Sequence, residues 1–271
     1  MIRLEFINGS LVPDMLAGLG ILQVPHLTTV DETDDQIAAK LALIAANNGP
    51  VFYVSTNDPA QFFNRSVMYH TKSWASHSGV IIPEGWAREV RLQYPNLLQR
   101  RTLDDVLTDI RILPPVPAEV KGMEVVESQA TVAISDPAAV VKRGEFMVAF
   151  LRDWTDAQAM AITRAAYWLY GAPYDVWEIA RKVGLPFPKF KQIFVCSSLT
   201  AWAAWGKNPD LREDDPINEP RGDTQMRQWF IDRQIDPDEP TPADDARYWF
   251  SNGLFRLLAF RCNLAEAWAK I

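Results

Sequence analysis

Residues 192–205, QIFVCSSLTAWAAW, decide the fold that the sequence predicts. An apolar, strand-like run leads into a run of small and apolar residues that predicts a helix beginning close to Cys196. A cysteine in the first turn of a helix lies beside unpaired backbone N–H groups and the positive end of the helix dipole, and both favour the thiolate. The stretch therefore predicts a strand–helix junction that presents Cys196 as a nucleophile. The alternative is a buried structural cysteine, a common environment for this residue.

The remaining sequence predicts strands and helices in mixed order. Short apolar or alternating runs bounded by turn residues predict strands, and amphipathic runs with start or stop signals predict helices. We expect strands at 2–6, 51–55, 77–82, 86–93, 130–135 and 145–152, and helices at 34–46, 59–72, 102–111, 155–171, 175–183 and 222–232. The helix from Thr155 starts with a capping-box pattern that pairs Thr155 with Gln158. Because strands and helices do not alternate in strict βα units, the fold class that we expect is α+β.

The composition is that of a globular protein and disfavours several functions. Of the 271 residues 48% are hydrophobic, and ten Trp and thirteen Phe supply apolar surface for a core. The net charge of −7 disfavours binding to a phosphate backbone, so we expect no nucleic-acid partner. Two Cys are too few for a disulfide framework, and the three His are not clustered with them. With no Gly-rich nucleotide loop either, we expect no metal and no cofactor.

A thiolate nucleophile needs a base, which is usually a histidine oriented by a third polar group. The candidates are His26, His70 and His77. We favour His77, because it opens the apolar strand HSGVII, where a side chain can face a cleft while the rest of the strand packs. The alternative is a histidine that only completes the edge of a sheet.

The orienting acid is predicted from the segment that follows this strand. A Pro-Glu-Gly turn at 83–85 returns the chain as WAREVRLQ, which we interpret as a strand antiparallel to HSGVII. In such a hairpin Glu89 lies across from His77 and accepts its second ring N–H. The alternative is an exposed strand glutamate.

These pieces together resemble a known family, the circularly permuted NlpC-type cysteine hydrolases, the YiiX-like branch of the papain-like superfamily. That family typically has an SHVGI strand, a VVEA strand, a strand ending in Arg, a helix closing on G-x-PYD, and finally CSEL. The corresponding residues here, in the same order, are His77, Glu89, Arg152, Tyr174 with Asp175, and Cys196. The resemblance covers about residues 50–206.

The resemblance implies a fold and a catalytic set. The fold is a permuted papain-like domain, with an antiparallel sheet packed against the helix of the nucleophile. Cys196 is the nucleophile, His77 the base and Glu89 the orienting acid. We expect a catalytic core at 49–206. The segments on either side lie outside the resemblance: we expect 1–48 to be an N-terminal extension packed on the core, and the acidic, Pro-rich segment 207–271 to belong to the same domain.

Two further residues are candidates for substrate contact. Ser197 is a small residue directly after the nucleophile and leaves space for a substrate beside the sulfur. The amide groups of the same turn suit an oxyanion hole. Tyr174 is expected to line the cleft near the oxyanion, and the alternative is that it packs against the next helix.

The activity that the resemblance implies is a thiol hydrolase that cleaves an amide bond, with cell-wall peptide as the first expected substrate. A lipid acyltransferase or thioesterase uses the same acyl-enzyme chemistry and is one alternative. A catalytically inert structural or phage-particle protein is another, and the terminal segments suit a docking partner.

The start of the sequence predicts a location in a cytoplasm. Arg3, Glu5 and Asp14 fall where a secretory signal needs an apolar run. Export by another route and packaging into a virion stay open. No stretch has the roughly 18 consecutive apolar residues that span a bilayer, so we expect no transmembrane segment.

Overall fold

The fold is built on an antiparallel sheet of six strands. The computed structural model describes residues 4–7, 10–13, 33, 35–36, 39, 49–56, 62–95, 97–98, 119–128, 131–141, 145–151, 155–172, 174, 181, 186, 195–205, 223–251 and 255–261. The sheet has the strand order β6-β5-β4-β3-β7-β8, and every neighbouring pair is antiparallel. Its strands are β3 (Val51–Ser55), β4 (His77–Ile82), β5 (Glu124–Ser128), β6 (Val132–Ser135), β7 (Phe146–Leu151) and β8 (Phe255–Arg261). A separate hairpin consists of β1 (Leu4–Ile7) and β2 (Ser10–Pro13).

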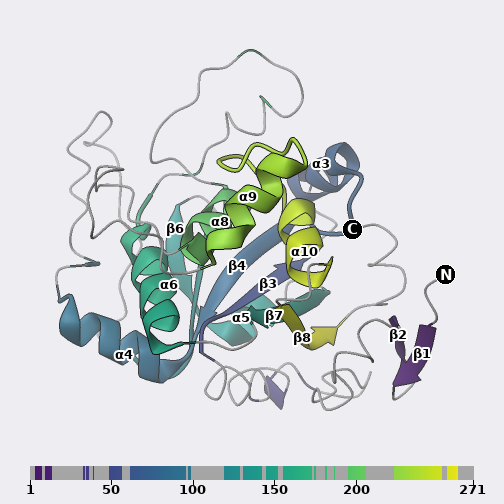
Figure 1. Cartoon of the computed structure of the whole chain (residues 1–271). Coiled ribbons are helices and arrows are strands. Elements are labelled where there is room, and N and C mark those ends of the chain that lie inside the picture. Colours follow the sequence, from purple (N-terminus) through teal and green to yellow (C-terminus); the bar gives the residue numbers. More distant parts are fainter. Residues whose placement is uncertain are drawn as a thin grey trace.

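Helices cover the sheet, and the class is α+β as the sequence predicts. The described helices are α3 (Phe62–Thr71), α4 (Glu84–Gln93), α5 (Pro137–Val141), α6 (Asp156–Trp168), α8 (Cys196–Trp205), α9 (Thr224–Asp232) and α10 (Pro242–Ser251). Helix α8 lies across β4, with α6 on one side of it and α9 and α10 on the other (Figure 1). No helix within the described ranges is both long enough and apolar enough to cross a membrane.

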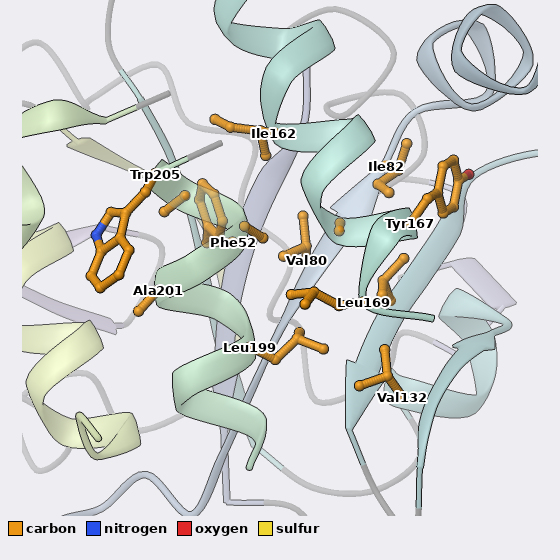
Figure 2. Close-up of a cluster of buried hydrophobic side chains, with 14 of the residues drawn as sticks. Phe52, Val80, Ile82, Val132, Ile162, Tyr167, Leu169, Leu199, Ala201 and Trp205 are labelled. Atoms are coloured by element: carbon orange, nitrogen blue, oxygen red, sulfur yellow. The ribbon is translucent and has the colours of Figure 1, made fainter. Parts of the chain in front are cut away.

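The core lies between the central strands and α6 and α8. Side chains alternate along a strand, so Val80 and Ile82 share the face of β4 that packs into the core cluster. Leu199 and Ala201 of α8 and Ile162 of α6 meet that face (Figure 2). This packing fixes α8 against β4 and so sets where the first turn of α8 lies.

Several predicted elements are confirmed because their signals are local. The strands at 51–55 and 77–82 form with these bounds, and both are short, buried runs bounded by turn residues. The capping box is present: the Thr155 hydroxyl accepts from the Gln158 N–H, and the Gln158 side chain accepts from the Thr155 N–H. The predicted helices at 102–111 and 175–183 and most of the predicted helix at 34–46 lie outside the described residues.

The strand predicted at 86–93 is wrong, because this segment is the helix α4. Ala87 and Val90 are its buried residues, and their spacing of three is that of one helix face. The pair Glu84 and Arg88 forms an i,i+4 salt bridge on its outer side. No hairpin therefore brings Glu89 across from β4.

Candidate active site

The sulfur of Cys196 lies at the first residue of α8, beside the start of β4. Ser198 holds this turn: its hydroxyl accepts from the Val195 N–H at 3.0 Å and contacts the Val195 carbonyl oxygen at 3.2 Å. The Val195 oxygen also accepts from the Leu199 N–H. Cys196 is buried, and its Sγ lies 4.0 Å from the carbonyl oxygen of Ser76, the residue that precedes His77. The helix that begins at Cys196, as predicted, thus places the thiol next to the predicted base, while the strand predicted before it lies outside the described residues.

His77 is the first residue of β4, and neighbouring hydrogen bonds fix the backbone there. The Ser76 N–H donates to the Ser55 carbonyl oxygen at 2.9 Å, and the Ser76 hydroxyl donates to the Thr56 carbonyl oxygen. The His77 ring is 4% exposed and forms a side-chain hydrogen bond with Cys196. Its Nε2 lies 2.9 Å from a Glu127 oxygen, which leaves Nδ1 as the nitrogen for the sulfur.

The acid beside the His77 ring is Glu127 and not Glu89. Glu127 is in β5 and pairs with Gly79 of β4, so its side chain is a diagonal neighbour of His77 on the same face. Its carboxyl group is fully buried. Glu89 is instead exposed on α4, where its Oε1 accepts from the Gln93 amide at 2.6 Å. The assignment of Glu89 is therefore corrected to Glu127.

Tyr53 completes this row of residues from the other side of β4. Tyr53, Gly79 and Glu127 are aligned across β3, β4 and β5. The tyrosine ring crosses over Gly79, and its hydroxyl donates to Glu127 Oε2 at 2.8 Å. A Cβ at position 79 would lie only 2.5 Å from Cε1 of Tyr53. Glycine is thus needed here for the close approach of the ring, and the carboxylate accepts from both Tyr53 and His77.

The electrostatics of the site favour a charged pair of Cys196 and His77. Burial by itself lowers the pKa of His77, but the Cys196 thiolate and the Glu127 carboxylate outweigh it and raise this pKa to about 9. Because a coupling between two charges is reciprocal, the imidazolium favours the thiolate form of Cys196 in return. The arrangement can hold a nucleophile and a proton donor side by side near neutral pH.

Ser197 and Tyr174, the two predicted substrate contacts, have different outcomes in the structure. The Ser197 hydroxyl is buried and donates to the Pro240 carbonyl oxygen at 2.6 Å, so it anchors the segment before α10 and does not line open space. This corrects the role given to its side chain, while its backbone N–H remains in the first turn of α8. Tyr174 is partly buried, and its contact with substrate stays a prediction.

Glu127 was missed although the sequence carries a signal for it. Residues 125–128 are Val-Val-Glu-Ser, which match the VVEA strand of the family resemblance better than WAREV does. Within the described part of the chain, no group of three or more His, Cys, Asp or Glu residues is arranged to hold a metal ion. His26, Arg152, Asp175 and Cys262 lie outside the described residues, and His70 lies in α3.

Searches of family models and of curated proteins found no match to this chain.

Proposed function

We propose that the protein is a cysteine hydrolase that cleaves an amide bond, with Cys196 as nucleophile, His77 as acid and base, and Glu127 as the acid that orients His77. The observation that carries the proposal is the buried Cys196–His77–Glu127 chain of contacts, which begins at a helix N-terminus. A permuted papain-like fold belongs to the same proposal. The antiparallel sheet packed against α8 is compatible with it.

In the first half of the reaction the thiolate attacks the amide carbonyl carbon, and the carbonyl electron pair moves to oxygen. Backbone N–H groups of the first turn of α8 stabilise this oxyanion. The His77 imidazolium then gives its proton to the amide nitrogen as the C–N bond breaks. The products of this half are a free amine and a thioester on Cys196.

In the second half, neutral His77 takes a proton from water while the water oxygen attacks the thioester. The C–S bond breaks, the acid product leaves, and the thiolate–imidazolium pair is restored. Glu127 stays charged throughout and holds the ring through Nε2, as Tyr53 holds Glu127. The preference for cell-wall peptide as substrate is supported by the family resemblance alone.

The proposal is tested by incubating purified peptidoglycan fragments with the protein and quantifying newly released amino groups and cleaved fragments by mass spectrometry. Parallel reactions use an acyl ester and an acyl thioester, because the lipid acyltransferase and thioesterase alternatives predict activity there. The matched variants are Cys196→Ser and Cys262→Ser, which remove the two thiols in turn. The proposal expects amide cleavage that Cys196→Ser abolishes and Cys262→Ser retains. Cleavage that survives Cys196→Ser overturns it, and so does ester or thioester cleavage with no amide cleavage.

A further inference from the structure

A second polar cluster lies behind the nucleophile, and the catalytic steps above do not use it. It consists of Asp245 in α10, Thr200 in α8 and Ser78 in β4, all three fully buried. Asp245 Oδ2 lies 2.9 Å from the Thr200 hydroxyl and 3.2 Å from the Ser78 hydroxyl, and these two hydroxyls are 2.9 Å apart. Three separate elements thus meet in one network of hydrogen bonds.

This network joins the elements that carry the nucleophile and the base. Thr200 follows Cys196 by one helical turn, and its Oγ1 lies 2.8 Å from the Cys196 carbonyl oxygen. Ser78 directly follows His77 in β4. Asp245 is therefore connected by hydrogen bonds to both elements, α8 and β4, that carry the sulfur and the imidazole ring.

We propose that Asp245 is a positioning residue: an uncharged carboxylic acid that, through Thr200 and Ser78, fixes the first turn of α8 against the start of β4. The inference rests on the proposed role of Cys196 as nucleophile and deepens it.

The hydrogen-bond inventory favours the uncharged acid. Thr200 has one hydroxyl hydrogen, and the Cys196 carbonyl oxygen, its nearest partner, can only accept. The same hydroxyl is also within donating distance of Asp245 Oδ2, at 2.9 Å, and one hydrogen cannot serve both acceptors fully. When it goes to the Cys196 oxygen, a proton on Oδ2 supplies the second hydrogen bond. Oδ1 has no hydrogen-bond partner among the described residues and is fully buried. In the neutral acid Oδ1 is an uncharged carbonyl oxygen. Burying it without a hydrogen-bond partner costs far less free energy than burying an oxygen that carries half of the carboxylate charge.

The charges around Asp245 act in the same direction. Burial raises the pKa of Asp245 well above its usual range, and the Asp244 and Cys196 anions add to this rise. Hydrogen bonding with Thr200 and Ser78 acts in the opposite direction and does not cancel the rise. Of these groups, Asp244 lies in the same helix as Asp245, Cys196 lies in α8, and Ser78 lies in β4. A second anion behind the thiolate would weaken the thiolate–imidazolium pair. A neutral acid provides the same hydrogen bonds without that penalty.

The first test is infrared spectroscopy of the wild-type protein with isotope-labelled aspartate at neutral pH, and it requires no activity. The proposal expects the C=O stretch of a protonated carboxyl group that disappears in Asp245→Asn and shifts in Thr200→Val. Thr200→Val leaves the band of any other protonated aspartic acid unchanged, so its effect identifies the Asp245 band. The absence of an Asp245 band overturns the proposal even if Cys196 proves to be the nucleophile.

The second test is the pH dependence of alkylation of Cys196 by iodoacetamide in Asp245→Asn, Thr200→Val and the surface control Asp238→Asn. An uncharged Asp245 predicts that Asp245→Asn leaves the pH midpoint unchanged and the rate within about threefold, because an amide is a neutral replacement that still donates. A charged Asp245 predicts a midpoint about one unit lower in Asp245→Asn, because an anion is lost. Thr200→Val is expected to slow alkylation at least tenfold, and an unchanged rate in that variant contradicts the positioning role. If Cys196 is inert in every variant, the proposed function fails while the infrared result stands.

Discussion

Gly79 is the position where a single methyl group disturbs the site most directly. In Gly79→Ala the new Cβ would lie 2.5 Å from Cε1, 2.8 Å from Oη and 2.9 Å from Cζ of Tyr53. Ordinary contacts between carbon atoms are about 3.5–4.0 Å, so the ring must move by about 1 Å. Tyr53 is buried and pinned by its hydrogen bond to Glu127, so it cannot turn away without losing that bond.

The expected cost is the sum of two effects. Overpacking of a buried site costs about 1–3 kcal/mol, and a lost hydrogen bond to a charged group costs about 1.5–3 kcal/mol. A shift of the ring relieves the steric clash but breaks the hydrogen bond, so the two costs are alternatives in part and do not add in full. We therefore expect Gly79→Ala to lower the free energy of unfolding by about 3 kcal/mol. We also expect slower alkylation of Cys196, because Glu127 loses one of the groups that hold it.

The assay is urea unfolding, with Gly85→Ala as the matched control. Gly85 is in α4, and a Cβ there meets no atom within 4 Å, so alanine should stabilise that helix by up to about 1 kcal/mol. Adding Tyr53→Leu to Gly79→Ala removes the ring, so a double-mutant cycle should show that the two costs are not additive. A loss below about 0.5 kcal/mol in Gly79→Ala, or strict additivity in the cycle, would show that the Tyr53 ring does not depend on glycine at position 79.

Three more predictions concern the candidate site. Glu127→Gln should reduce the rate of amide hydrolysis by about 10²-fold or more, because the charge that orients the imidazolium is lost. Glu89→Gln, at an exposed position, should leave the rate unchanged. Equal effects of the two variants in steady-state kinetics would contradict the assignment of Glu127. The pKa of His77, raised to about 9, means that its ring is charged below a pH of about 9 and loses its proton above it. ¹⁵N NMR should show this midpoint falling in Cys196→Ser, because the thiolate that raises the pKa is absent. An unchanged midpoint would exclude the charged pair. Ser198→Ala should lower the free energy of unfolding, measured by calorimetry, by about 1 kcal/mol, because the hydrogen bond from the Val195 N–H is lost. An unchanged free energy would show that this hydrogen bond does not stabilise the start of α8.

Local signals account for the parts of the fold that the sequence predicted. The strand before His77 and the capping box at Thr155 depend on residues within one short segment, and both are observed. The strand expected at 86–93 depends on the turn at 83–85, which favours a hairpin with the strand before it. The spacing of Ala87 and Val90 fits a helix face, and Leu92 is exposed.

The missed parts of the site depend on contacts between distant segments. Glu127 meets His77 across 50 residues of sequence, through the register of β5 against β4. Asp245 meets Ser78 across 167 residues, through the packing of α10 near α8. A pattern within one segment cannot specify such a register. Cys196 and His77 could be predicted because each lies at the end of a helix or strand that its own segment indicates. Glu127 and Asp245 could not be predicted, because their contacts depend on segments far away in the sequence.

A charged pair of Cys196 and His77 has a direct signature, the pH dependence of alkylation of the native protein by iodoacetamide. The rate at Cys196, resolved from that at Cys262 by mass spectrometry, is followed in wild type, His77→Ala and Cys262→Ser. We expect labelling of Cys196 with a pH midpoint well below the value of about 8.5 of a free thiol. This midpoint should move back toward that value in His77→Ala and stay unchanged in Cys262→Ser. Labelling confined to Cys262, or a Cys196 midpoint that His77→Ala leaves in place, would contradict the charged pair.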